Sequence, residues 1–207
     1  MTRIKCCGLT RVDDMQLAAR LGADAVGFVL TRKSKRFVDP EAAARLRDAV
    51  PPFVSVVALV MDDEPAYVAE VVRVLRPDML QFHGVETAAE CAAYGVRWLK
   101  AIAMGEGERA LARLHDYPGA AGLLLDGHGL GEQGGSGQRF DWSLMPQDLA
   151  QPLVLAGGLT PANVAEAIRV ARPWAVDVSS GIESSPGIKD RDKMERFISA
   201  VRAVPSV

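Results

Sequence analysis

Two residues that can exchange protons with a substrate stand at the ends of short apolar runs. Cys7 closes the run Arg3–Cys7, and Asp126 directly follows the run 122–125. Two-residue alternation places Cys7 on the same side of an extended segment as Lys5, whose positive charge is expected to favour the thiolate and lower the thiol pKa. The alternatives to a catalytic role are structural: Cys7 could be a small core residue, and Asp126 could cap a turn or a helix.

Glycines and serines follow the last two apolar runs of the chain. The run Leu153–Ala156 and the run Ala175–Val178 each lead into small residues. Exposed backbone N–H groups and hydroxyls in such loops suit a phosphate dianion, and the N-terminus of a following helix adds partial positive charge. Structural turns alone are the alternative for either segment. The candidate phosphate-binding residues are Gly157, Gly158, Ser179, Ser180 and Gly181.

Three further polar residues follow or end other apolar runs. Arg36 could hold a carboxylate through two parallel hydrogen bonds, although a solvated basic loop explains it equally well. Gln81 and His83 share one side of an extended segment, where His83 is a ligand contact, a general base or a satisfied core imidazole. A zinc site made by Cys7, His83 and Asp126 has no local ligand spacing to support it, so no metal is predicted.

The elements that must position these residues alternate along the chain. Eight short β-rich runs are each followed by a segment that could be a helix, and 207 residues shared among eight units gives about 26 per unit. This arithmetic favours one (β/α)8 barrel over residues 1–207, with a doubly wound open sheet as the runner-up. The predicted strands are Arg3–Cys7, Ala25–Leu30, Val54–Val60, Met79–Phe82, Trp98–Ala101, Gly122–Leu125, Leu153–Ala156 and Ala175–Val178.

Several helix boundaries are predicted from local signals. Asp39 and Thr160 each precede a proline that suits the first turn of a helix, and Thr87 with Glu90 has capping-box spacing. Gly22 stands where a helix would end in the left-handed conformation. In a barrel, the residues just after the strands form the active site, and the loops after strands seven and eight commonly bind phosphate.

Composition excludes several classes of protein. The net charge of −2 and the lack of a long basic block argue against nucleic-acid or membrane binding as the main function. No apolar run reaches the roughly 20 residues that span a bilayer, and the N-terminus lacks a signal-peptide core, so a cytoplasmic location is expected. Three cysteines without a paired spacing indicate reduced thiols.

The segment from Gly127 to Gly137 is unusually rich in glycine and predicts a mobile lid. Within it, residues 129–134 match the Gly-x-Gly-x-x-Gly fingerprint of dinucleotide-binding proteins. That fingerprint functions only where its last glycine opens a helix, and here the loop continues through further glycines. No nicotinamide or flavin cofactor is therefore expected.

Taken together, these motifs resemble the phosphoribosylanthranilate isomerase family from end to end. The order of the motifs is more specific than any one of them, and Cys6 departs from the branched apolar residue that is usual there. The resemblance rests on Lys5-Cys6-Cys7-Gly8-Leu9-Thr10, Gly27-Phe28-Val29, Ser34-Lys35-Arg36, Gln81-Phe82-His83-Gly84, Leu125-Asp126, Gly134-Gly135-Ser136-Gly137, Phe140-Asp141-Trp142, Ala156-Gly157-Gly158-Leu159-Thr160-Pro161, Val176-Asp177-Val178-Ser179-Ser180-Gly181-Ile182-Glu183, Pro186-Gly187 and Lys189-Asp190.

The resemblance implies an Amadori rearrangement of N-(5-phosphoribosyl)anthranilate, a phosphosugar, in tryptophan biosynthesis, without cofactor or metal. It implies that Asp126 is the general acid, which must then hold a proton near neutral pH, and that Cys7 is the general base. Arg36 would hold the anthranilate carboxylate, and Asp177 would contact the sugar or order the phosphate loop. The family that this chain resembles includes both monomers and homodimers.

Two other functions are compatible with this set of residues. The related isomerase of histidine biosynthesis runs the same rearrangement on another aminoaldose, but that group resembles a barrel with Asp at the position of Cys7. A catalytically silent barrel that binds a sugar phosphate is the second rival, and the presence of both Cys7 and Asp126 weighs against it.

Overall fold

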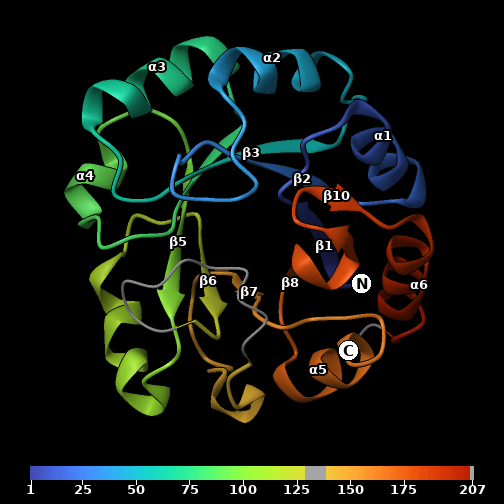
Figure 1. Ribbon diagram of the computed structural model, residues 1–207. Coiled ribbons are helices and arrows are strands. Elements are labelled where there is room, and N and C mark those ends of the chain that lie inside the picture. The colour runs from blue at the N-terminus through green and yellow to red at the C-terminus, as the bar shows by residue number, and fades with distance from the viewer. Residues whose placement is uncertain (129–138, 206–207) are drawn as a thin grey trace.

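The computed structural model describes residues 1–128 and 139–205, and it contains a closed barrel of eight parallel strands (Figure 1). Neighbouring strands pair in sequence order, and β8 pairs with β1 to close the ring. The predicted barrel is thus confirmed, and the open-sheet alternative is wrong. The strands are β1 (Arg3–Cys7), β2 (Ala25–Val29), β3 (Ser55–Val60), β4 (Met79–Phe82), β5 (Trp98–Ala103), β6 (Gly122–Asp126), β7 (Leu153–Leu155) and β8 (Ala175–Val178).

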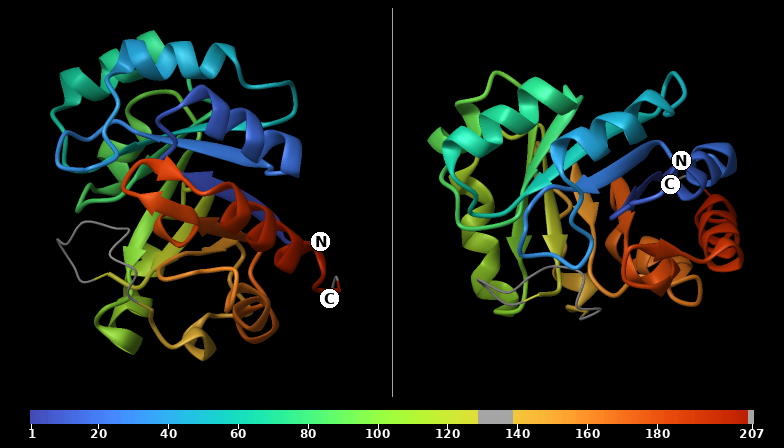
Figure 2. Two further views of the ribbon diagram at one scale, coloured as in Figure 1. Left: turned by 45° about the vertical axis from the view of Figure 1, so that its right-hand side comes forward. Right: turned by 45° about the horizontal axis from the view of Figure 1, so that its top comes forward.

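Helices surround the barrel on its outside, as the views in Figures 1 and 2 show. None of the helices in the described residues is both long and apolar enough to cross a membrane. The α-helices are α1 (Val12–Leu21), α2 (Pro40–Asp48), α3 (Pro65–Leu75), α4 (Ala88–Ala92), α5 (Val164–Ala171) and α6 (Arg191–Arg202). The 3-10 helices are η1 (Gly107–Asp116), η2 (Trp142–Leu144) and η3 (Ser180–Ile182), and a small hairpin is formed by β9 (Glu183–Ser185) and β10 (Ile188–Lys189).

Most of the predicted helix boundaries are confirmed by the side chains that form them. The Asp39 carboxylate accepts a hydrogen bond from the Ala42 N–H at 2.7 Å and so caps α2. Thr87 and Glu90 form both halves of a capping box at the start of α4. Gly22 ends α1 with φ of 96°, a conformation that costs glycine little.

The helix after β7 begins later than the sequence predicts. It starts at Val164, with Asn163 at the N-cap, and residues 161–163 form a turn ahead of it. The Asn163 side chain accepts a hydrogen bond from the Thr160 N–H at 2.8 Å and donates one to the Gly158 carbonyl at 2.9 Å. These bonds stabilise the turn and connect it to the end of β7, and the Val164 N–H donates to the Thr160 carbonyl at 3.1 Å where the turn leads into the helix.

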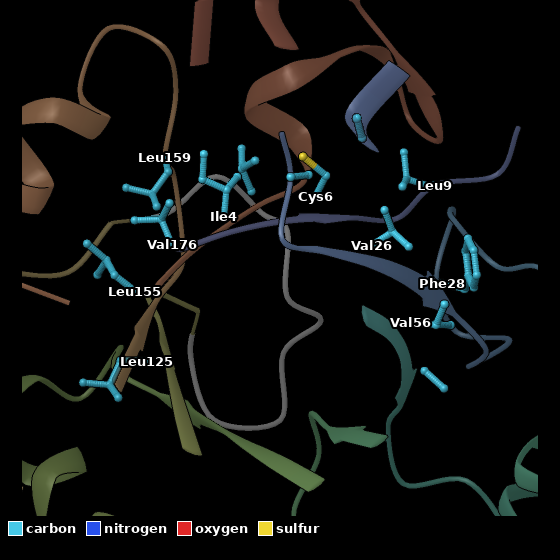
Figure 3. Close-up of a cluster of buried hydrophobic side chains, with 14 of the residues drawn as sticks. Ile4, Cys6, Leu9, Val26, Phe28, Val56, Leu125, Leu155, Leu159 and Val176 are labelled. Atoms are coloured by element: carbon cyan, nitrogen blue, oxygen red, sulfur yellow. The ribbon is translucent and has the colours of Figure 1, made fainter. Parts of the chain in front are cut away.

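The core has two layers, one on each face of the strands. Residues that face the helices form the larger cluster, and Figure 3 shows Ile4 and Cys6 within it. A smaller cluster of mostly small side chains fills the barrel interior, namely Ala101, Leu124, Val154, Ala156 and Ala175. Lys5 and Cys7 therefore point inward, as two-residue alternation predicts. Gly27 lies beside them, and a Cβ there would come within 2.9 Å of the Cys7 sulfur.

Candidate active site

One cavity at the carboxyl ends of the strands is lined by every site residue that the sequence indicates. Parallel strands end at the same side of the barrel, so residues that are far apart in the chain meet there. The predicted residues on this cavity are Cys7, Arg36, Gln81, His83, Asp126, Gly157, Gly158, Asp177, Ser179, Ser180 and Gly181.

Cys7 lies next to a buried ion pair inside the barrel. The Lys5 Nζ is 2.9 Å from the Asp177 Oδ1, and both side chains are nearly inaccessible. Burial opposes the charge of Lys5, but Asp177 and Cys7 outweigh it and raise the pKa of Lys5. The expected lowering of the Cys7 pKa is wrong, because burial raises that pKa more than the Lys5 charge lowers it. In the unliganded protein, Cys7 is therefore mainly a thiol at neutral pH.

Asp126 is packed against two histidines, of which the sequence pointed to only one. His83 Nε2 lies 3.7 Å from Asp126 Oδ2, and His128 Nδ1 lies 3.3 Å from Asp126 Oδ1. The His83 and His128 rings stack with centroids 4.7 Å apart. His128 could have been found from two-residue alternation after β6, since it shares the side of Asp126, but the glycines around it suggest only a loop.

The protonation states in this cluster differ from those expected. Burial lowers the pKa of His83 to about 4, despite the opposing charge of Asp126, so the imidazole is neutral at pH 7. Burial opposes ionisation of Asp126, but contact with the imidazoles outweighs it and lowers the pKa of Asp126 below its usual value. The expectation that Asp126 holds a proton near neutral pH is therefore wrong for the unliganded protein.

Arg36 is held in the cavity by residues from the β9–β10 hairpin. Its Nε and Nη2 donate to the two oxygens of Glu183 at 2.8 and 2.7 Å. Lys189 Nζ donates to Glu183 Oε1 at 2.8 Å and to the Cys7 carbonyl at 2.7 Å. Burial opposes ionisation of Glu183, but Arg36 and Lys189 outweigh it and lower its pKa. Sequence reasoning gave Glu183 and Lys189 no role, because the contacts join residues about 150 to 180 positions apart.

The loops after β7 and β8 approach each other closely and present an unsatisfied hydroxyl. Gly157 and Gly158 have φ of 81° and 62°, a region that disfavours side chains. A Cβ at Gly181 would overlap the Leu159 carbonyl oxygen, so glycine is required there. The buried Ser179 Oγ has no hydrogen-bond partner in the part of the chain that the structure describes. A buried donor of this kind is suited to an anionic ligand.

Most of the segment after Asp126 lies outside the described residues. The predicted lid falls mainly on residues 129–138, which lie outside the described residues, as does the fingerprint at 129–134. Gly127 and His128 are described, and His128 is buried with 2% of its surface exposed.

Thiol labelling of the native protein is expected to modify Cys7 alone among the three cysteines. Cys6 and Cys91 are fully buried, and burial raises the pKa of each to about 12, so neither supplies thiolate. Cys7 is the only one of the three that lines the described cavity. Iodoacetamide treatment followed by peptide mass spectrometry measures this, with urea-unfolded protein as the control in which all three react. Equal labelling of Cys6 in the native protein would contradict it.

The closed barrel, with charged and polar side chains lining a cavity at the carboxyl ends of its strands, defines the class of (β/α)8-barrel enzymes. The family model described as N-(5'phosphoribosyl)anthranilate (PRA) isomerase matches residues 4–200. The chain therefore belongs to the N-(5'-phosphoribosyl)anthranilate isomerase family, and it is an isomerase of tryptophan biosynthesis.

Similar proteins cover the whole barrel. The N-(5'-phosphoribosyl)anthranilate isomerase of Thiobacillus denitrificans is 52% identical over 201 residues, which are 97% of this chain and 98% of that protein. The crystal structure of phosphoribosyl anthranilate isomerase from Thermotoga maritima is 42% identical, with a TM-score of 0.90 and coverage of 98% and 99%. Another crystal structure of phosphoribosyl anthranilate isomerase, 39% identical with a TM-score of 0.87 and coverage of 98% and 99%, is in complex with reduced 1-(o-carboxyphenylamino)-1-deoxyribulose 5-phosphate.

Proposed function

We propose that this chain catalyses the Amadori rearrangement of N-(5'-phosphoribosyl)anthranilate with Asp126 as general acid and Cys7 as general base. Asp126 protonates the furanose ring oxygen, and the ring opens to an iminium. Cys7 then removes the C2′ proton, and the resulting enolamine tautomerises to the ketone. The iminium is itself the electron sink, so the reaction needs neither a metal nor an organic cofactor.

The order of residues around the barrel mouth is the observation that carries this proposal. The phosphate loops follow β7 and β8, which lie between β6, carrying Asp126, and β1, carrying Cys7. Arg36 follows β2, the strand next to β1, and its guanidinium contacts Glu183, which follows the loop after β8. All of these groups line or border one cavity, so a ligand with a phosphate at one end and a carboxylate at the other can contact the loops, Arg36, Cys7 and Asp126 at once.

The two proton-transfer groups need opposite changes when substrate binds. Asp126 must gain a proton, and exclusion of water from the cavity favours the neutral acid. Cys7 must lose one, and the Lys5 ammonium beside it stabilises the thiolate. Lys5 is thus a positioning residue, since it acts through Cys7.

Loss of anthranilate fluorescence on adding the protein to freshly made substrate tests the proposed activity. Fluorescence is expected to fall in proportion to protein concentration. Binding of a reduced product analogue without loss of fluorescence would favour the silent binding barrel. Conversion of the histidine-pathway aminoaldose, but not of this substrate, would favour the related isomerase.

Replacing Arg36 by Ala is expected to raise KM by roughly 10- to 100-fold with a smaller change in kcat, because hydrogen bonds to a charged ligand contribute about 1.5–3 kcal/mol. Glu183 uses the Nε–Nη2 edge of the guanidinium, so the Nη1–Nη2 edge is the one that can face a substrate carboxylate. Steady-state kinetics measures kcat and KM separately. Lys35→Ala, an exposed neighbour, is the matched control. A fall in kcat at constant KM would contradict the assigned role.

The value of kcat/KM is expected to be flat through the neutral range, because the form that reacts holds a proton on Asp126 and none on Cys7. Burial raises the pKa of Cys7, so its thiolate fraction grows about tenfold per pH unit below that pKa. The pKa of Asp126 is lowered, so its protonated fraction falls by the same factor per pH unit above that pKa, and the two changes cancel. Measurement of kcat/KM in overlapping buffers, on both sides of neutral pH, checks this. A rise of about tenfold per pH unit through the neutral range would show that the proton on Asp126 is not required.

We propose that the phosphosugar substrate is the small-molecule partner of this chain. The protein is a monomer or a homodimer in solution, and its location is the cytoplasm. Sedimentation equilibrium distinguishes the two states. Cell fractionation tests the location.

A further inference from the structure

We propose that His83, Asp126 and His128 form a binding site for one borderline divalent transition-metal ion, with Zn²⁺ as the representative. Occupation of this site would inhibit the isomerase. The metal is an inhibitor in this proposal, because the rearrangement itself proceeds without one. The inhibition rests on the proposed role of Asp126, whereas the binding rests on geometry alone.

The spacing of the three ligand atoms fits a tetrahedral ion. Bonds of about 2.0–2.2 Å from Zn²⁺ to nitrogen and oxygen place neighbouring ligand atoms about 3.3–3.6 Å apart. His128 Nδ1 lies 3.3 Å from Asp126 Oδ1, and His83 Nε2 lies 3.7 Å from the other oxygen, Oδ2. One ligand atom from each residue lies within 4.8 Å of the other two. Small side-chain rotations therefore suffice to surround an ion.

Two of these ligand atoms are buried and lack partners. His83 Nε2 and His128 Nδ1 make no hydrogen bond within the described ranges, although each histidine is more than nine-tenths buried. Buried polar atoms are normally paired, because an unpaired one costs about 1–3 kcal/mol. Both nitrogens lie against the Asp126 carboxylate without hydrogen-bond geometry. A cation between them would satisfy all three groups.

Gln81 can hold His83 in the orientation and tautomer that a metal requires. Its Nε2 lies 3.1 Å from His83 Nδ1, and its Oε1 has no partner within the described ranges. A half-turn of the amide exchanges these atoms, so that Oε1 accepts a hydrogen bond from the Nδ1–H. The lone pair of His83 Nε2 then faces Asp126. Metal-bound histidines usually have such a partner on the other ring nitrogen.

The ligand atoms determine which metal ions the site prefers, and two cavities allow an ion to reach it. Two imidazoles and one carboxylate suit Zn²⁺, Co²⁺ or Ni²⁺ better than Mg²⁺ or Ca²⁺, which prefer oxygen ligands. The active-site cavity reaches His83 and Asp126, and a second cavity reaches His83 and His128. A bound ion would occupy the Asp126 oxygens and prevent them from protonating the ring oxygen.

Isothermal titration with Zn²⁺, in the absence of substrate, tests the site directly. We expect one ion per chain, and a loss of affinity of at least about 100-fold in His83→Asn and His128→Asn. His115→Asn is the matched control, because His115 is the one histidine of the chain outside the cluster and lies exposed in η1. Cys7→Ser should bind as the wild type does. Binding that Cys7→Ser abolishes, or that both cluster variants retain, would overturn the proposal.

Three further measurements protect the test against misfolded variants and against an error in the proposed function. The Co²⁺-loaded wild type should show the visible spectrum of a four- or five-coordinate site without thiolate, whereas a thiolate-to-metal band would overturn the proposal. Gln81→Leu should bind Zn²⁺ about 10- to 100-fold more weakly with the ligands intact. Zn²⁺ should inhibit turnover reversibly, with EDTA restoring it. If the chain binds Zn²⁺ but does not turn over substrate, only the proposed function fails.

Discussion

The Asp126→Asn variant is expected to turn over substrate at least about 100-fold more slowly than the wild type, because positioned general acids contribute roughly 10²- to 10⁴-fold. Asparagine keeps the shape of the side chain at the end of β6 but cannot supply a proton to the ring oxygen. Cys7→Ser is expected to lose a similar factor, since a serine hydroxyl ionises far less readily than a thiol. Steady-state kcat by anthranilate fluorescence measures both.

Two matched control variants show whether such losses of kcat are specific to the active-site residues. Asp148→Asn changes the same residue type on an exposed stretch before β7, and Cys91→Ser changes a cysteine within α4. Both should keep kcat within about twofold of wild type, as substitutions away from a site usually do. Near wild-type turnover by either Asp126→Asn or Cys7→Ser would refute the assigned proton transfer.

Replacing Lys5 by Met is expected to lower the free energy of unfolding by about 3–5 kcal/mol, because it leaves the buried carboxylate of Asp177 without its ion-pair partner. The Lys5 Nζ is 2.9 Å from that carboxylate, and only 6% and 10% of the two side chains are exposed. The same change removes the positive charge next to Cys7. The pKa of Cys7 should therefore rise further, and kcat/KM should fall across the neutral range.

The double variant Lys5→Met, Asp177→Leu separates the two effects. It removes both charges, so it should be more stable than Lys5→Met alone. Its catalytic defect should remain, since the charge beside Cys7 is still absent. Urea unfolding gives the stabilities of the wild type and both variants. A loss below about 1 kcal/mol for Lys5→Met would mean that the pair contributes little to folding.

Local chemistry allowed the elements of the barrel to be predicted closely. The strands are short, apolar runs, and the helix starts at Asp39 and Thr87 depend on side chains within three residues of the cap. The helix after β7 starts at Val164 and not directly after Thr160, and the Asn163 side chain bonds to the Thr160 N–H in the turn before it and to the Gly158 carbonyl. Proline spacing alone does not distinguish these two outcomes.

The protonation of the site could not be predicted from neighbours in the sequence. Lys5 is next to Cys7 as expected, but the sign of the Cys7 pKa shift depends on how completely the barrel excludes water. The state of Asp126 depends on His128, which the barrel packs against it. Glu183 reaches Arg36 only because the first strand of the β9–β10 hairpin lies next to the loop after β2.

The amino-acid sequence is sufficient to predict the barrel, its family and the residue types that surround the cavity. Strand ends can be located from the chain, and parallel strands in a barrel all end on the same side. The three-dimensional structure is needed to show which charges are buried, which polar atoms lack partners, and where the His83, Asp126 and His128 side chains meet. Burial and long-range contacts set the energy of a charge, and neither quantity is a property of a local stretch of sequence.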